Sequence, residues 1–207
     1  ERISIKPQTM SDQVLQAIGR RHTARDIREA FCTAREVGFA CINMDLIAGL
    51  PQDSVEGFRD SLEEVLALRP ENITVHTLAM KKGSRLMEAG GALPSGEETG
   101  RMVDLSLEAL EGAGYRPYYL YRQKYMSGGL ENVSWCLPGT ENHYNIIMME
   151  ELQSVLSLGA GGVTKLVDRS SGRIVRLTNP KYPHDYLAMS AKVLEQKDEI
   201  LRFYREV

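Results

Sequence analysis

The stretch NMDLIAGLP, Asn43–Pro51, decides the fold that this sequence predicts. Its apolar residues are typical of a buried strand, and Gly49 to Pro51 provide the turn that ends it. A carboxylate, Asp45, stands in the middle of this strand. Because a charged side chain is costly to bury alone, Asp45 must face either a neighbouring polar group or a ligand.

Strands and helices alternate around this stretch. We expect helices to begin after Thr23, Ser54 and Ser95, because each of these capping residues precedes apolar residues at helical spacing. Strands are predicted at about 2–8, 39–48 and 72–79. Since parallel strands need a crossover of about a dozen residues, usually a helix, this order predicts an α/β fold with a parallel sheet.

The pattern changes after residue 114. A β-hairpin is predicted over residues 164–179, and a last helix from about Asp185 to Glu206. The Gly-rich LGAGG, Leu158–Gly162, is interpreted as a tight strand crossing or bulge, because no helix start follows it. We therefore expect an α/β domain over 1–114 and a smaller α+β domain over 115–207.

Composition limits the classes of function. The 207 residues carry a net charge of -3, which provides no basic field and argues against nucleic acid as a partner. No apolar run approaches the roughly 18 residues of a membrane span. Three scattered cysteines predict neither a disulfide framework nor a metal site, and indicate a reducing cytoplasm. Cys32 and Cys41 are interpreted as small buried residues.

Polar residues gather where the predicted strands end. In parallel α/β folds, ligands bind at the carboxyl ends of the strands. The residues expected at this rim are Gln8, Arg20, Arg21, Asp45, Ala79, Lys81, Lys82 and Arg85. Together they suit a ligand with hydroxyls, a positive centre and a carboxylate. The alternative is structural: Asp45 pairs with a neighbouring Arg or backbone amides, and the cations at the rim are solvated.

Longer motifs resemble a known family. RISIKPQTMSDQVLQAIGRRH, the segment from AREVGFACINMDLIAGLP to VHTLAMKKGS, ENVSWCLPGTENHYN and SLGAGGVTK are similar to the oxygen-independent coproporphyrinogen III oxidase family of radical S-adenosylmethionine (SAM) enzymes. The KKGS and YRQK…ENV segments resemble its HemZ-type coproporphyrinogen dehydrogenase branch. The resemblance covers nearly the whole chain.

The resemblance implies an incomplete (β/α) radical SAM barrel that binds SAM and a [4Fe-4S] cluster, followed by an α+β domain that covers the substrate. The implied reaction is oxidative decarboxylation of two propionates of coproporphyrinogen III, a tetrapyrrole, to vinyl groups in haem biosynthesis. The residues implied to contact SAM are Gln8, Arg20, Asp45, Ala79 and, after the LGAGG segment, Lys165. Some of Arg21, Lys81, Lys82 and Arg85 are expected to line the entrance for the substrate's propionates.

One departure from the family is large. The CxxxCxxC loop that holds the cluster in the family does not occur in this sequence. We therefore expect the chain to lack the N-terminal segment of the barrel, to leave the cluster ligands outside it, and to be inactive alone. The alternatives are a haem-binding chaperone of the same family and an ordinary barrel enzyme that uses Asp45 as a general base. The absence of an obvious haem ligand pair favours the enzyme.

Overall fold

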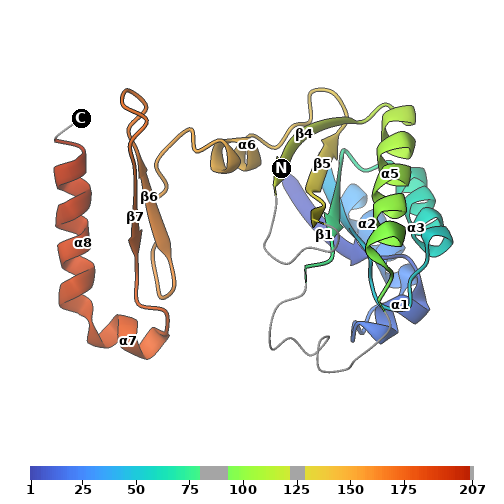
Figure 1. Cartoon of the computed structure of the whole chain (residues 1–207), viewed down its shortest axis with the longest axis horizontal. Coiled ribbons are helices and arrows are strands. Elements are labelled where there is room, and N and C mark those ends of the chain that lie inside the picture. Colours follow the sequence, from blue (N-terminus) through green and yellow to red (C-terminus); the bar gives the residue numbers. More distant parts are fainter. Residues whose placement is uncertain (80–92, 122–128, 206–207) are drawn as a thin grey trace. The chain divides into compact units, whose positions relative to one another are not determined.

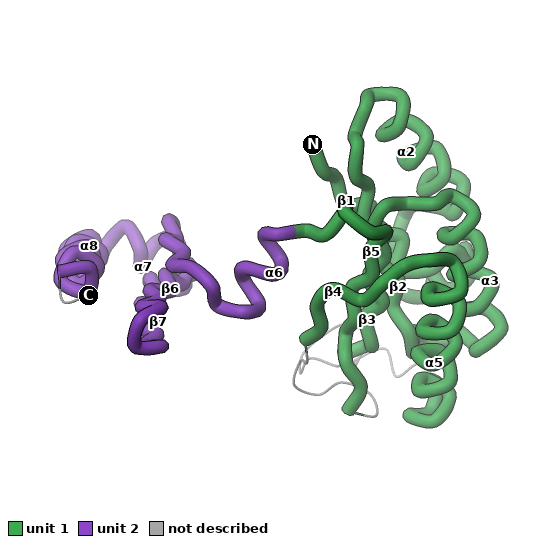
Figure 2. Tube along the Cα trace, turned by 90° about the horizontal axis from the view of Figure 1, so that it is seen from above, with its two compact units in different colours: residues 1–142 green, residues 143–207 purple. Residues whose placement is uncertain are grey.

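The computed structural model describes residues 1–79, 93–121 and 129–205, and these residues form two compact units. Unit 1 is Glu1–Asn142 and unit 2 is His143–Val207 (Figure 2).

Unit 1 contains a five-stranded sheet with the strand order β1-β2-β3-β5-β4. Its first three strands are parallel, as predicted, whereas β5 is antiparallel to both β3 and β4. The elements of unit 1 are β1 (Arg2–Gln8), α1 (Asp12–Ala17), α2 (Ala24–Val37), β2 (Cys41–Ala48), α3 (Val55–Leu68), β3 (Asn72–Thr77), α5 (Gly96–Gly112), β4 (Arg116–Tyr121) and β5 (Asn132–Cys136) (Figure 1).

The helices begin where the sequence predicts. Thr23 and Ser95 each form a complete capping box with the acidic residue three positions later, and Ser54 accepts a hydrogen bond from the backbone of Gly57. These contacts satisfy backbone N–H groups that have no partner within the helix. Helix α2 ends at Val37 and is capped by Gly38, whose φ of 93° is accessible to glycine at little cost.

The two faces of the sheet differ in chemistry. Helices α2, α3 and α5 lie against one face (Figure 2). Strand β2 sends Ile42, Met44 and Leu46 into the core on that side, where all three are fully buried. Because side chains alternate along a strand, Asn43 and Asp45 point to the opposite face. The helices' own apolar residues complete the core, with Phe58 and Leu62 among the most buried.

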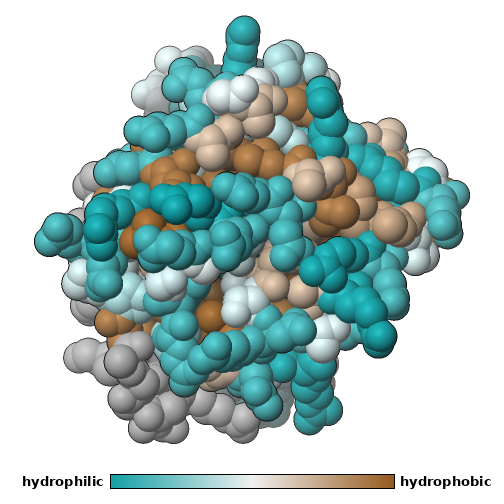
Figure 3. Space-filling view, turned by 90° about the vertical axis from the view of Figure 1, so that its right-hand side faces the viewer, coloured by the Kyte–Doolittle hydropathy of each residue, from teal (hydrophilic) through white to brown (hydrophobic). Residues whose placement is uncertain are grey.

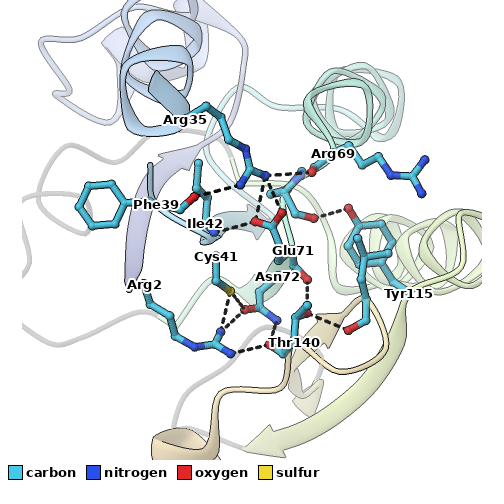
Figure 4. Close-up of polar contacts among 12 residues, drawn as sticks. Arg2, Arg35, Phe39, Cys41, Ile42, Arg69, Glu71, Asn72, Tyr115 and Thr140 are labelled. Atoms are coloured by element: carbon cyan, nitrogen blue, oxygen red, sulfur yellow. Dashed lines mark hydrogen bonds and ion pairs between the residues drawn. The ribbon is translucent and has the colours of Figure 1, made fainter. Parts of the chain in front are cut away.

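A polar cluster joins the amino ends of the parallel strands (Figure 4). Arg2 donates hydrogen bonds to the Cys41 sulfur and to Asn72 Oδ1, at 2.7 and 2.6 Å, and to the carbonyl of Thr140 at 2.8 Å. Asn72 Nδ2 donates to the same carbonyl at 3.0 Å. This cluster therefore ties β1, β2 and β3 to the segment after β5.

Glu71 anchors a second part of this cluster (Figure 4). Its carboxylate accepts hydrogen bonds from Arg35 Nη2 at 2.8 and 2.9 Å and from the backbone N–H of Ile42 at 2.8 Å. Arg35 also donates to the carbonyls of Phe39 and Arg69. The pair thereby links the end of α2 to the starts of β2 and β3.

The structure divides the chain later than residue 114, the boundary expected from the sequence. Strands β4 and β5 continue the sheet of unit 1, because β5 pairs with β3 from Asn72↔Cys136 to Val75↔Val133. The boundary between the compact units lies after Asn142. The pairing of segments about 60 residues apart is a long-range contact, and hydrophobic pattern alone does not reveal it.

Unit 2 contains the predicted hairpin. Its elements are α6 (His143–Met149), β6 (Val163–Val167), β7 (Ile174–Thr178), α7 (Pro183–Ala188) and α8 (Ser190–Phe203). The strands β6 and β7 are antiparallel, and Leu166, Leu177 and Phe203 form a small buried cluster. The prediction of a single last helix from Asp185 was wrong, because the helix is interrupted at Met189, where ψ is 35°.

The outer surface shown in Figure 3 is largely hydrophilic, with hydrophobic residues in small patches. Among the residues that the structure describes, no helix combines the length and the apolar character needed to cross a membrane.

We predict that Glu71→Ala lowers the free energy of unfolding of unit 1 by about 2 kcal/mol, because Arg35 and the Ile42 N–H both lose a partly buried acceptor. Urea unfolding followed by the fluorescence of Trp135, the chain's one tryptophan and a core residue of unit 1, measures this. Glu64→Ala is the control, since its ion pair with Arg28 is exposed and is expected to contribute less than about 0.5 kcal/mol. Equal effects of the two substitutions would contradict the role of Glu71.

Asp53, in the loop before α3, gives a prediction about pH. Its Oδ1 accepts a hydrogen bond from the Ser54 N–H at 2.9 Å, while Oδ2 is buried with no hydrogen-bond partner among the described residues. Burial raises the pKa of this carboxyl from 3.8 to about 6. Between these two values the folded state holds the proton that the unfolded state has lost, so stability falls as pH rises.

Asp53→Asn removes this penalty. We expect the variant to be more stable than the parent chain by about 1 kcal/mol at pH 7.5, a figure reduced for the side chain's partial exposure. The difference is expected to shrink as pH falls from about 6 to about 4. Thermal unfolding across this range tests it, and a difference independent of pH would show that Asp53 is not the titrating group.

Candidate functional site

Polar side chains line the face of the sheet that the helices leave open. They occupy alternate positions on neighbouring strands: Asn43 and Asp45 on β2, Thr74 and His76 on β3, and Ser134 on β5. The register pairs Asp45 with Thr74, and Thr74 with Ser134. Strand alternation therefore collects residues far apart in sequence into one polar surface.

Asp45 is the most confined charge on this surface, with only 6% of the residue exposed. Its Oδ1 accepts a hydrogen bond from Asn43 Nδ2 at 2.6 Å. Oδ2 lies 3.6 Å from Lys6 Nζ and 3.8 Å from His76 Nε2 and accepts no hydrogen bond from the residues that the structure describes. One oxygen of the carboxylate is thus held in place while the other keeps its capacity to accept.

The surroundings of Asp45 keep it ionised. Burial raises its pKa, but contacts with His76 and Asn43 and the positive charges of His76 and Lys6 outweigh burial, so the pKa is lowered overall. Of the structural alternatives, neither an arginine nor a backbone amide contacts this carboxylate among the described residues. Instead, Lys6 forms a long ion pair with Oδ2, and the His76 imidazole stands on its other side, both beyond hydrogen-bond distance.

Asn43 connects Asp45 to a chain of hydrogen bonds across the sheet. Its Nδ2 also donates to Ser4 Oγ at 2.9 Å, and its Oδ1 accepts from Thr74 Oγ1 at 3.1 Å. Thr74 and Ser134 share a hydrogen bond of 2.8 Å. Because each member is fixed by the next, the Asp45 carboxylate has a defined orientation.

Gln8 was expected beside Asp45, and the structure places it at the end of β1, opposite Leu46 in the register and 8% exposed. Its φ of 71° is in the left-handed region, which costs a non-glycine residue about 1–2 kcal/mol. The register shifts between Ile5 and Gln8, so the end of the strand leaves the regular pleat. Such strain is common at functional sites.

For the other predicted rim residues within the described ranges, the structure gives a position in the chain and an exposure but no contact with Asp45. Ala79 follows β3 and is half-buried, while Arg20 and Arg21 are exposed in the loop after α1. Lys81, Lys82 and Arg85 lie outside the described residues.

Lys165 belongs to unit 2 and has internal partners there. Its ammonium donates to the Met148 carbonyl at 3.2 Å and lies 3.4 Å from a Glu151 carboxylate oxygen, which Arg176 also contacts. The nearby glycines have structural reasons: Gly161 has a φ of 70° and donates to the Pro180 carbonyl. These contacts are compatible with a structural role for the segment, and the predicted role of Lys165 toward SAM stays a prediction.

The structure tests the burial that the sequence predicts for two of the cysteines. Cys41 is buried as expected, but Cys32 is exposed, so its predicted burial was wrong. It follows Phe31 on α2, and one residue along a helix turns the side chain about 100° away from the buried stripe. No group of three His, Cys, Asp or Glu residues in the described ranges is arranged to hold a metal ion.

Sequence reasoning missed Asn43, Thr74, His76 and Ser134. The usable signal was the period of two: polar residues at positions 43 and 45, and at 72, 74 and 76, alternate with apolar ones. The missing information was which strands become neighbours.

No protein-family model matches the chain. It is 40% identical over 209 residues to the oxygen-independent coproporphyrinogen-III oxidase-like protein HemZ of Bacillus subtilis. This match covers 100% of this chain and 41% of HemZ. The Bacillus subtilis heme chaperone HemW is 30% identical over 135 residues, 63% of this chain and 35% of HemW. The chain spans less than half the length of these relatives.

The coproporphyrinogen III oxidase HemN of Escherichia coli, a radical SAM enzyme, resembles the chain in structure. The TM-score is 0.61 at 20% identity, over 79% of this chain and 38% of HemN. This likeness shows a partial radical SAM fold, as the sequence predicted. Together with the match to HemZ over the full chain, it means that the chain belongs to the radical SAM family of oxygen-independent coproporphyrinogen III oxidases and their HemZ- and HemW-type relatives.

Proposed function

We propose that this chain is part of a radical SAM enzyme of haem biosynthesis that oxidatively decarboxylates two propionates of coproporphyrinogen III. The observation that carries the proposal is the Asp45 carboxylate: its pKa is lowered, Asn43 orients its Oδ1, and the neighbours of Oδ2, Lys6 and His76, stay beyond hydrogen-bond distance although the residue is only 6% exposed. The 40% identity to a HemZ-type protein along the whole chain supports the tetrapyrrole as substrate.

The polar face fits the ribose and sulfonium parts of SAM. Asp45 Oδ2 can accept a hydrogen bond from a ribose hydroxyl, and its negative charge favours a nearby positive centre. Gln8 ends the adjacent strand, and Arg20, in the loop that follows α1, supplies a guanidinium for the carboxylate of SAM. When bound beside a reduced iron–sulfur cluster, SAM supplies the hydrogen-abstracting radical chemistry of this family.

The described residues do not fit the [4Fe-4S] cluster that family members use. Cys32 is exposed on α2, and Cys41 contacts Arg2 and Asn72 at the amino ends of the strands, away from the carboxyl ends where ligands bind. We propose that the cluster ligands lie in a barrel segment outside this chain and that the chain alone is inactive. Its cysteines are free, in keeping with a reducing cytoplasm.

The second candidate is a haem-binding chaperone without decarboxylase activity, which the similarity to HemW favours. The two functions differ in chemistry. The full-length enzyme would consume SAM and release carbon dioxide from coproporphyrinogen III, whereas a chaperone would bind haem and do neither. Arg21, exposed after α1, is a proposed contact for the substrate's propionates, together with Lys81, Lys82 and Arg85.

We predict that Asp45→Asn weakens binding of S-adenosylhomocysteine, a stable analogue of SAM, by at least about tenfold, because a charged acceptor becomes a neutral amide of the same shape. Isothermal titration calorimetry on the cluster-free chain measures this. Asp104→Asn, at an exposed position of α5, is the control and is expected to bind like the parent chain. Full-length Asp45→Asn should also release no carbon dioxide.

Two results would contradict the proposal. Unchanged affinity in Asp45→Asn would remove Asp45 from the site. Loss of folding in this variant, seen in the Trp135 fluorescence, would identify Asp45 as a structural residue.

A further inference from the structure

His76 is the second polar group that faces the acceptor oxygen of Asp45. It lies two residues after Thr74 on β3, on the same face of the sheet, and its side chain is 24% exposed. Its Nε2 is 3.8 Å from Asp45 Oδ2, which is longer than a hydrogen bond. At this distance the two groups attract each other across a gap that a hydroxyl oxygen between them could close on both sides.

Tyr121 holds the His76 ring in this orientation. The phenolic oxygen is 3.2 Å from His76 Nδ1, and the two rings meet edge-on with centroids 6.3 Å apart. Tyr121 in turn stacks on Tyr119, with ring planes only 7° apart. Since Nδ1 is engaged by Tyr121, the nitrogen that faces Asp45 is Nε2. Where the phenol donates to Nδ1, the ring hydrogen of the neutral imidazole sits on Nε2.

A vicinal diol matches this pair of groups. A carboxylate oxygen only accepts hydrogen bonds, whereas an imidazole Nε2–H donates, and a hydroxyl group can do both. Adjacent hydroxyls on one ring are close enough together to address two atoms that stand 3.8 Å apart. One hydroxyl would donate to Asp45 Oδ2 while its neighbour accepts from His76 Nε2.

We propose that His76 is a ligand-contacting residue and that it forms, with Asp45, a two-point site for the vicinal diol of a ribose. This inference rests on the proposed function, because it assumes that a nucleoside binds on this face, and it adds the residue that distinguishes a ribose from a deoxyribose. Lys6, the cation near Oδ2, lies on the edge strand β1, and its side chain is 65% exposed, so it is less confined than His76.

The test measures hydroxyl discrimination. The affinities of S-adenosylhomocysteine and its 2′-deoxy and 3′-deoxy forms are determined by calorimetry for the parent chain, His76→Phe and His76→Gln. In the parent chain we expect each missing hydroxyl to weaken binding by roughly 5- to 10-fold. In His76→Phe, which keeps a ring but no nitrogen, the penalty for one of the two hydroxyls should disappear while the other, due to Asp45, remains.

Two further variants sharpen the result. His76→Gln, which restores a side-chain donor, should recover part of the lost discrimination. His184→Phe removes a histidine whose side chain is 79% exposed in unit 2 and should match the parent chain for all three ligands.

Other outcomes overturn the inference. If His76→Phe keeps both hydroxyl penalties, His76 does not touch the diol. If it weakens all three ligands equally, His76 only supports the shape or charge of the site. Should the parent chain show no binding that depends on Asp45, the proposed function fails together with this inference; binding that depends on Asp45 but not on His76 removes the inference alone.

Discussion

The alternation of side chains along β2 is the constraint on which the rest of the structure depends. Ile42, Met44 and Leu46 are fully buried against the helices, so Asn43 and Asp45 must point to the opposite face. A shift of one residue in this strand would place a carboxylate in the apolar core and expose three large apolar side chains. The burial that stabilises unit 1 thus also determines the direction in which the Asp45 carboxylate points.

Polar side chains at the two ends of the parallel strands differ in how fully they are hydrogen-bonded. At the amino ends, Arg2, Arg35 and Glu71 use their hydrogen-bonding capacity on other parts of the protein, which stabilises the fold (Figure 4). Further along the strands, one oxygen of Asp45 is fixed by Asn43, and the other has only the longer contacts with Lys6 and His76, at 3.6 and 3.8 Å. This asymmetry is what a ligand site requires, because the orientation of the carboxylate is settled before the ligand arrives.

Local features of the fold could be predicted from the sequence, and long-range ones could not. The capping boxes at Thr23 and Ser95 and the hairpin of β6 and β7 are set by residues close together in the chain. The continuation of the sheet by β4 and β5 depends on pairing with β3, which no local pattern encodes. Asp45 was recognisable as an anomaly in an apolar strand. His76 was not, because its partner Tyr121 is 45 residues away.

The central claim is that the polar face around Asp45 binds a nucleoside rather than serving only as a satisfied polar layer. A crystal structure of the chain grown with S-adenosylhomocysteine tests this most directly. The account predicts electron density for the ribose on this face, with a hydroxyl oxygen within hydrogen-bond distance of Asp45 Oδ2 and the contact from Asn43 unchanged. Density for the nucleoside elsewhere on the molecule, with Lys6 or His76 closed onto Asp45 Oδ2, would contradict it.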